Sequence, residues 1–142
     1  MFLLDVNCLV ALGWPNHVHF GRLRQWFGSA AEDGWATTTG VQAGFIRVSM
    51  NARVTGEPVS FREANRMLCE LLRAGRHETL AEVSPEAWPD WLVSRVQGYR
   101  QVTDAGLIAA ANEWGYTVAT LDVGLAELLD YDHRELVRLL KI

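Results

Sequence analysis

The sequence predicts an α/β domain whose central sheet is mostly parallel, with helices on both of its faces. Short apolar runs, typical of strands buried on both faces, alternate along the chain with longer segments in which apolar residues recur at helical spacing. Such alternation is typical of parallel sheets, because a helix connects each strand to the next. The 142 residues suit a single domain over positions 1–142, and a 49% share of hydrophobic residues supplies its core.

The first half of the chain is expected to contain two strands and four helices. Pro15 and Asn16 break the helical pattern, and Asn16 is a candidate N-cap for the next helix, whose apolar stripe includes Val18. Ser60 and Glu63 have the spacing of a capping box at the start of a later helix. The expected elements are a strand over 2–4, helices over 6–12 and 17–30, a strand over 34–37, a helix over 39–50, an exposed loop over 51–58 and a helix over 60–72.

The second half is expected to add three strands and further helices. Pro85 suits the first position of a helix that begins near Ser84. Gly115 ends an alanine-rich helix, and the apolar run after it closes on Asp122. The expected elements are a strand over 79–83, a helix from 84, a helix over 103–114, a strand over 117–121, a short helix to about residue 129 and a strand over 137–142.

Composition excludes several classes of protein. Cys8 and Cys69 are 61 positions apart, with no Cys/His cluster, which excludes a disulfide framework or a zinc ribbon. No apolar run approaches the roughly 20 residues of a membrane span. Asp5 interrupts the apolar N-terminal stretch, which is unlike a signal peptide. We therefore expect a cytoplasmic protein with no membrane partner.

The charged residues leave a nucleic-acid partner open. A net charge of −4 argues against a protein coated with positive charge. However, 12 of the 13 basic residues are arginine, whose side chain suits bidentate contact with phosphate. A genomic preference for arginine codons explains the same bias, so composition alone does not decide.

Three aspartates are expected at the carboxyl edge of the sheet, where ligands bind in such folds. Asp5 and Asp122 each follow an apolar strand directly, and Asp104 lies at the start of a helix. Each has a structural alternative, because Asp122 suits a helix N-cap and Asp104 complements a helix dipole. Asp5 is harder to explain in this way, since a buried strand rarely tolerates an unpaired carboxylate.

Convergence of these carboxylates favours a bound cation. Two carboxylates about 4 Å apart repel by roughly 4 kcal/mol at an effective dielectric constant near 20. The chain must protonate one, pair them with arginine or hold a cation. Oxygen ligands without cysteine or histidine select Mg²⁺ or Mn²⁺. Such an ion activates water and stabilises a phosphoryl transition state, so the pattern predicts metal-assisted hydrolysis of a phosphodiester.

Four segments resemble the motifs of the PIN-domain ribonucleases, in order and spacing, across nearly the whole chain. The most similar subgroup is the VapC-like toxins of bacterial type II toxin–antitoxin modules. The resemblance implies a PIN-like three-layer sandwich, Mg²⁺-dependent cleavage of structured RNA such as tRNA or rRNA, a homodimer, and a small VapB-like antitoxin as inhibitor. The segments are Leu3 to Asn7, Thr39 to Val48, Val102 to Ala105 and Ala119 to Leu125.

The resemblance also implies roles for individual residues. Asp5 and Asp104 correspond to the principal metal ligands, and Asp122 completes the acidic pocket directly or through water. Asn7 and Thr120 match polar positions that support these ligands.

Gln42 departs from the family pattern, which usually has a glutamate in the second motif. An amide oxygen accepts a hydrogen bond but carries no charge and cannot act as a base. We therefore expect the catalytic set Asp5, Gln42, Asp104 and Asp122 to hold one ion well and a second weakly or not at all. On this view Gln42→Glu tightens Mg²⁺ binding, whereas Asp5→Ala abolishes both binding and RNA cleavage.

Candidate RNA contacts are Arg47, which follows Gln42 on the same helix, and Arg95 and Arg100, which precede Asp104. Each is equally explained as a solvated surface arginine. The segment 88–91, with two tryptophans, is the best candidate for a partner surface. The four histidines show no ligand spacing, and none is assigned to catalysis: His17, His19, His77 and His133.

Two other functions compete with a ribonuclease toxin. A haloacid-dehalogenase-like phosphatase needs a second acid two residues after Asp5, and this chain has Asn7 there. It also has no lysine before Lys141 to neutralise a phospho-aspartate. A catalytically weak or inactive PIN-like module that binds RNA or protein remains open because of Gln42.

Overall fold

The computed structural model describes residues 1–142 and is built around a five-stranded sheet. All strand pairs are parallel, and the spatial order is β3-β2-β1-β4-β5. The predicted α/β class is confirmed, and the sheet is parallel throughout. The strands are β1 (Phe2–Leu4), β2 (Trp35–Thr38), β3 (His77–Leu80), β4 (Thr117–Thr120) and β5 (Val137–Leu139).

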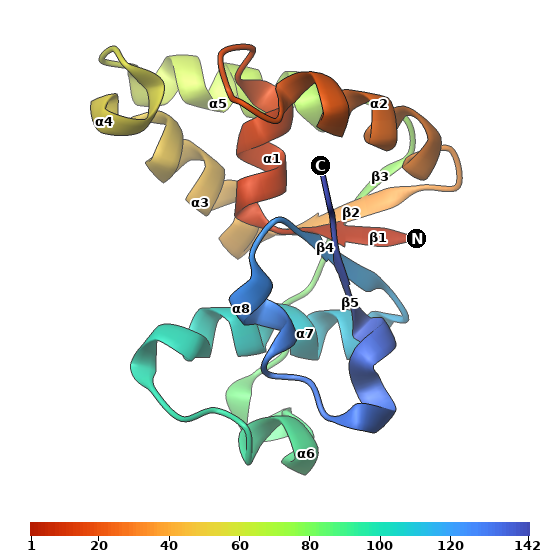
Figure 1. The fold of residues 1–142 in the computed structure, drawn as a ribbon. Coiled ribbons are helices and arrows are strands. Elements are labelled where there is room, and N and C mark those ends of the chain that lie inside the picture. Colours follow the sequence, from red (N-terminus) through yellow and green to blue (C-terminus); the bar gives the residue numbers. More distant parts are fainter.

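Helices cover both faces of the sheet and give the molecule three layers (Figure 1). One face carries α1 to α5, and the other carries α6 to α8 (Figure 1). The helices are α1 (Val6–Gly13), α2 (Phe20–Ala30), α3 (Thr39–Ser49), α4 (Ala52–Thr55), α5 (Phe61–Leu71), α6 (Asp90–Val93), α7 (Val102–Trp114) and α8 (Val123–Ala126). Short 3₁₀ turns are found at Pro85–Ala87, Tyr99–Gln101 and Tyr131–Leu136.

The strand order reverses between β1 and β4. The chain passes from β1 outward to β2 and β3 on one side, then returns to β4 and β5 on the other side. Leu3 pairs with Val118, and Leu4 pairs with Ala119, so the two strands end side by side. Such a reversal opens a crevice at the carboxyl ends of the strands, which is where α/β proteins bind ligands.

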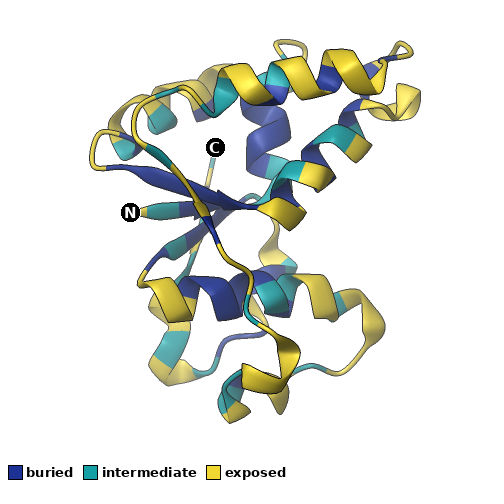
Figure 2. Cartoon of the chain, turned by 180° about the vertical axis from the view of Figure 1, so that it is seen from behind, coloured by how far each residue is buried: buried dark blue, intermediate teal, exposed yellow.

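The core lies between the sheet and its two helical layers, and Figure 2 shows buried residues along the central strands and along the helices that pack on them, α1 and α7. Leu3, Leu4 and Val118 are completely buried, as expected of strands covered on both faces. Cys8 is buried, Cys69 is exposed, and both are free thiols. No helix is both long enough and apolar enough to cross a membrane.

Local capping chemistry explains several helix boundaries. Ser60 Oγ accepts a hydrogen bond from the Glu63 backbone N–H at 3.2 Å, which confirms the predicted start of α5. Gly115 has φ +72° and ends α7 in the left-handed conformation that glycine adopts without strain. Both predictions depended on residues that act through the nearby backbone.

Five expectations about local structure are wrong. The predicted loop 51–58 contains α4, because Asn51 caps it and Gly56 ends it with φ +83°. The third strand is displaced toward the N-terminus and ends at Leu80, because its register follows β2 rather than the apolar run after it. Pro85 begins only a three-residue 3₁₀ turn.

The other two corrections concern the turn before α2. Asn16 is not the N-cap of α2, because its side chain donates to the Thr55 carbonyl at 3.3 Å and the helix begins at Phe20. Val18 therefore lies in the turn, not on the apolar stripe, and is 86% exposed.

Candidate active site

Asp5 lies at the end of β1, and hydrogen bonds hold both of its carboxylate oxygens. Oδ1 accepts from the Val6 backbone N–H at 2.6 Å and caps α1. Oδ2 accepts from Thr120 Oγ1 at 2.7 Å and from Asn7 Nδ2 at 3.1 Å. Burial raises the pKa of Asp5 above its ordinary value, while the hydrogen bonds from Thr120 and Val6 favour the ionised form. Its side chain is therefore fixed in one orientation at the strand reversal.

Thr120 and Asn7 connect this carboxylate to β4. Thr120 is completely buried, and its hydroxyl accepts from the Asp122 backbone N–H at 3.0 Å. Asn7 Oδ1 accepts from the Leu121 backbone N–H at 3.1 Å. The two residues join the carboxyl ends of β1 and β4, which places Asp122 near Asp5.

Asp122 is the N-cap of α8, which is the structural role that the sequence offered for it as an alternative to metal binding. Its Oδ1 accepts from the Gly124 backbone N–H at 2.8 Å. Its charge nevertheless contributes to raising the pKa of both Asp5 and Asp104. Capping and proximity to the other acids therefore occur together, and the first does not exclude a role in the site.

Asp104 lies in the first turn of α7, and its pKa is the most informative in the site. Burial, and to a smaller extent the charges of Asp5 and Asp122, together raise the pKa of Asp104 to about 6. No hydrogen bond to the carboxylate acts against this shift. A bound cation would remove the mutual repulsion of the three carboxylates and favour their ionised forms.

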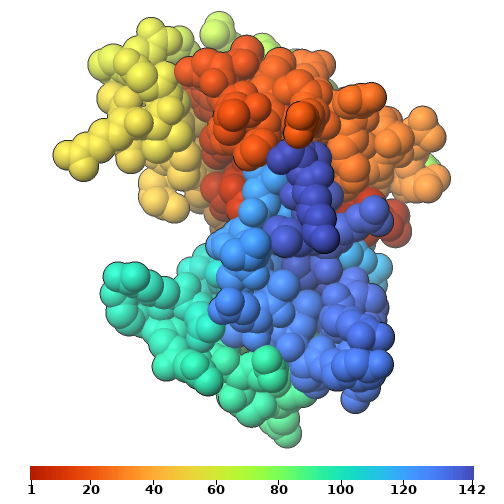
Figure 3. Space-filling model, in the orientation of Figure 1, coloured from red at the N-terminus to blue at the C-terminus, as the bar shows by residue number.

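The three carboxylates line one cavity of about 470 Å³, together with Arg47 of α3 and His17 of the turn before α2. Figure 3 shows the surface hollowed between α3 and α4 on one side and the start of α7 on the other, the elements that supply this lining. As the side chains lie, no three or more His, Cys, Asp or Glu groups form a set that could hold a metal ion. The acids therefore share a cavity without forming a closed set of ligands.

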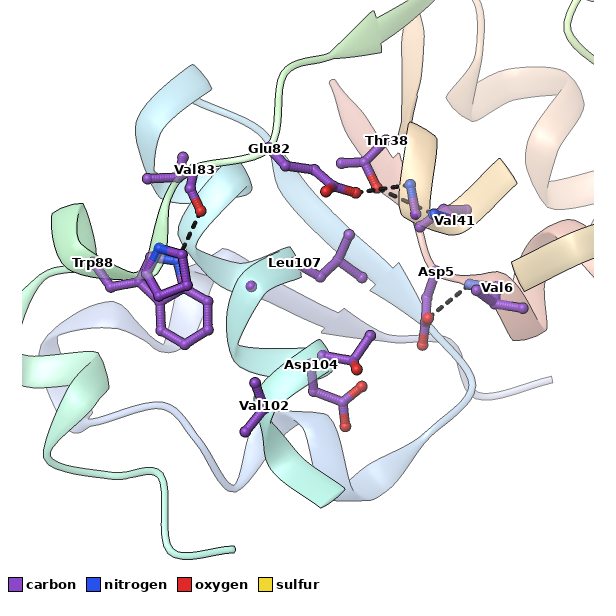
Figure 4. A pocket seen from close by; sticks show the side chains of 14 residues that line it. Asp5, Val6, Thr38, Val41, Glu82, Val83, Trp88, Val102, Asp104 and Leu107 are labelled. Atoms are coloured by element: carbon purple, nitrogen blue, oxygen red, sulfur yellow. Dashed lines mark hydrogen bonds between the residues drawn. The ribbon is translucent and has the colours of Figure 1, made fainter. Parts of the chain in front are cut away.

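Asp5 and Asp104 also line a neighbouring cavity of about 250 Å³, and Figure 4 shows both side chains on the side of it away from Trp88. Glu82 lies at its rim, and its Oε1 accepts from the Gly40 backbone N–H at 2.7 Å. Trp88 forms the far wall (Figure 4), and its indole N–H donates to the Val83 carbonyl at 3.0 Å. A fourth acid therefore lines the same cavity as Asp5 and Asp104, two residues after the end of β3.

Gln42 lines neither cavity. Its Nε2 donates to Thr37 Oγ1 at 2.9 Å and to Thr79 Oγ1 at 3.0 Å, which directs the amide toward β2 and β3. The structure therefore does not bring Gln42 together with the three aspartates that it was predicted to join.

Of the three arginines predicted to contact RNA, only one lies at a cavity. Arg47 lines the larger cavity, whereas Arg95 and Arg100 line neither. Arg95 donates to the Glu127 carbonyl at 2.9 Å, and Arg100 donates to the Tyr99 hydroxyl at 3.2 Å. In the predicted partner surface, Trp91 stacks on His133 with 3.9 Å between ring centroids. Both tryptophans of that segment thus have contacts within the chain.

His17 and Glu82 are the two ionisable residues at the cavities that the sequence did not indicate. Glu82 follows β3, so a correct strand end at Leu80 would have marked it as an acid at the carboxyl edge. The helix predicted over 17–30 includes His17, but this residue lies in the turn that leads to α2. Each omission follows from a misplaced element boundary.

The fold and the site together define a class. A parallel sheet with this strand order, layered between helices and carrying aspartates at the reversal between β1 and β4, is the PIN-like arrangement that the sequence motifs predicted. No protein-family model matches the chain.

Three relatives from Mycobacterium tuberculosis identify the family. The chain is 42% identical to Ribonuclease VapC38 over 142 residues, which cover 100% of this chain and 99% of the relative. It is 36% identical to Ribonuclease VapC39 over 134 residues, or 88% and 91% of the two chains. It is 35% identical to Ribonuclease VapC29 over 132 residues, or 89% of each. The chain belongs to the VapC family of PIN-domain ribonuclease toxins, which are hydrolases of phosphodiester bonds.

Proposed function

We propose that this chain is a Mg²⁺- or Mn²⁺-dependent endoribonuclease toxin that cuts structured RNA, with Asp5, Asp104 and Asp122 as its acidic centre. The observation that supports this proposal most directly is that all three carboxylates and Arg47 line the same cavity at the reversal of strand order.

The donor chemistry of the cavity fits a divalent cation of this kind. Its acidic side chains offer only oxygen, and burial together with the like charges of Asp5 and Asp122 raises the pKa of Asp104, which a bound cation would offset. Mg²⁺ binds one or two carboxylates directly and keeps several waters, so it does not require a closed set of protein ligands. Bound there, the ion would lower the pKa of a coordinated water and offset the charge of the phosphoryl transition state.

The residues around the cavity have different roles in the proposed reaction. Asp5 is held by Thr120, Asn7 and the Val6 N–H, so its position costs little reorganisation when substrate arrives. Arg47 offers a guanidinium to an RNA phosphate on the α3 side of the cavity. Asp122 approaches from the β4 side, with one oxygen engaged by the Gly124 N–H.

Cleavage of a tRNA pool and of rRNA by the purified protein tests the proposal. We expect cleavage in Mg²⁺ that is lost in EDTA, in Asp5→Ala and in Asp104→Asn. Asp33→Ala is the matched control, because Asp33 is exposed and lines neither cavity. Calorimetric titration of Mg²⁺ supplies a readout other than activity. Unchanged cleavage in Asp104→Asn would contradict the proposal, whereas RNA binding without cleavage would favour the non-catalytic alternative suggested by Gln42.

The family also suggests partners, which we include in the proposal. A small VapB-like antitoxin would inhibit the chain, and basic side chains on it would complement the acidic cavity. Co-expression with the protein encoded beside this gene, followed by the cleavage assay, tests inhibition. Light scattering of the isolated toxin tests the proposed homodimer.

A further inference from the structure

The turn between α1 and α2, residues 14–19, carries a histidine to the rim of the acidic cavity. His17 is half-buried and lines the cavity with Arg47 and the aspartates. Sequence spacing gave this histidine no role, and the proposed function does not use it.

This turn is held firmly against α3 and α4. The Trp14 indole N–H donates to Ser49 Oγ at 2.8 Å, and Asn16 Nδ2 donates to the Thr55 carbonyl at 3.3 Å. Within the turn, the His17 backbone N–H donates to the Trp14 carbonyl at 2.9 Å. The turn therefore places the imidazole in a fixed position beside the α3 side of the cavity.

The hydrogen bond of the ring fixes its tautomer. His17 Nδ1 accepts from the His19 backbone N–H at 3.1 Å, so Nδ1 carries no proton. In the neutral ring the proton is then on Nε2, which is a donor. Burial and the neighbouring His19 lower the pKa of His17, which keeps the ring neutral near pH 7.

We propose that His17 is a substrate-binding residue that donates a hydrogen bond from Nε2 to a phosphate oxygen of the RNA, without adding positive charge to the cavity. The inference rests on the proposed function, since it assumes an RNA substrate. The location favours phosphate over a base, because Arg47 lines the same cavity and is suited to the adjacent phosphate oxygens. A fixed neutral donor binds phosphate without competing with a cation for the three carboxylates.

The test separates a neutral donor from a cationic contact. Binding of a fluorescein-labelled RNA stem-loop is measured by anisotropy at about pH 7 over a series of salt concentrations. All proteins carry Asp104→Asn and are kept in EDTA, so that the strand is not cut. The variants are His17→Ala, His17→Gln, Arg47→Ala and His19→Ala. His19→Ala is the matched control, because it removes an imidazole from the same turn and keeps the backbone N–H that fixes the tautomer of His17.

We expect His17→Ala to raise Kd about three- to tenfold, the range of one neutral hydrogen bond. The slope of log Kd against log salt should be unchanged, whereas Arg47→Ala should reduce it by about 0.7. His17→Gln retains an amide donor and should recover part of the affinity, and His19→Ala should bind like the parent. Thermal unfolding midpoints check that each variant is folded.

Three results overturn the inference. Equal Kd for His17→Ala, His19→Ala and the parent would show that the imidazole does not contact RNA. A reduced salt slope in His17→Ala, like that of Arg47→Ala, would show a cationic contact. Failure of the parent to bind the stem-loop would contradict the proposed function itself, and normal binding by His17→Ala contradicts only the role of this histidine.

Discussion

The hydroxyl of Thr120 donates to Asp5 Oδ2 over 2.7 Å and connects the ends of β4 and β1 at the acidic edge. Thr120 Oγ1 itself accepts from the backbone N–H of Asp122 at 3.0 Å and from Asn7 Nδ2 at 3.2 Å. It is completely buried, so no water replaces these partners if it is removed. One hydroxyl therefore sets the relative positions of two of the three aspartates.

Thr120→Val keeps the shape of this side chain and deletes the hydroxyl. We expect the free energy of unfolding to fall by about 1–3 kcal/mol, because the Asp122 N–H and the Asp5 carboxylate lose a buried partner. RNA cleavage should fall with it, since Asp5 is less firmly held. Urea unfolding and the cleavage assay measure the two effects.

Thr117→Val is the control on the same strand. Its hydroxyl makes only an exposed bond of 3.3 Å to the Glu135 carbonyl, so we expect a change within about 0.5 kcal/mol and normal cleavage. Equal effects of the two substitutions would show that the Thr120 hydroxyl has no special importance.

Asp104 predicts a pH dependence of stability in the absence of metal. Its pKa of about 6 in the folded protein lies above the value of 3.8 for a free aspartate, chiefly because of burial. Between these values the folded state binds more protons than the unfolded state, so stability falls as the pH rises from about 4 to about 6. Near pH 7 the Asp104 carboxyl is ionised, and the full loss of folding stability that results is present.

Asp104→Asn removes that penalty. In EDTA near pH 7 we expect it to raise the free energy of unfolding by about 1 kcal/mol, less than the full pKa shift implies because the carboxyl is partly exposed and screened. The gain should disappear near pH 4, and urea unfolding across this range measures it. Asp33→Asn, at an exposed site, should show no such trend. A gain that is independent of pH would contradict the assigned titration.

Helix boundaries were predictable where residues close in sequence determine them. Ser60 caps α5 through a backbone N–H three residues away, and Gly115 ends α7 through its own φ angle. The third strand was misplaced because its register is set by pairing with β2, a contact about 40 residues distant. Propensity within a short window carries no information about such a partner.

The positions of the site residues were predictable only where a strand end determines them. Asp5 and Asp122 follow β1 and β4 directly, so a correct strand places each of them at the edge. Gln42 lies on a helix, and its direction depends on hydroxyls from two strands, which no spacing in the sequence reveals. His17 depends on a turn fixed by contacts with α3 and α4.

The orientation of Gln42 changes the prediction for Gln42→Glu. The sequence pattern predicts tighter Mg²⁺ binding, but the amide is engaged by Thr37 and Thr79 outside both cavities. A carboxylate held there acts from a distance, so we expect the Mg²⁺ affinity of Gln42→Glu to stay within about twofold of wild type. Calorimetry measures this, with Asp5→Ala as the variant that should lose binding. Tenfold tighter binding would show that residue 42 turns into the site.

Gly44 lies where α3 packs closely on α1, next to the residue that donates to Asp5. A Cβ at this position would lie 2.7 Å from Val6 Cγ2, and the Val6 N–H is the donor to Asp5 Oδ1. The valine side chain has one strongly preferred rotamer in a helix, so relief requires the helices to separate. Gly44→Ala therefore combines overpacking with displacement of the hydrogen bond from the Val6 N–H to Asp5.

We expect Gly44→Ala to lower the free energy of unfolding by about 1–2 kcal/mol, because overpacking outweighs the gain of up to about 1 kcal/mol in helix propensity. Gly28→Ala in α2 is the matched control: nothing lies within 4 Å of its added Cβ, so it should gain about 0.5–1 kcal/mol. Adding Val6→Ala should compensate part of the loss in Gly44→Ala, and a double-mutant cycle from urea unfolding measures this coupling. A stabilising Gly44→Ala, or a cycle with no coupling, would show that α1 and α3 can separate at this contact without cost.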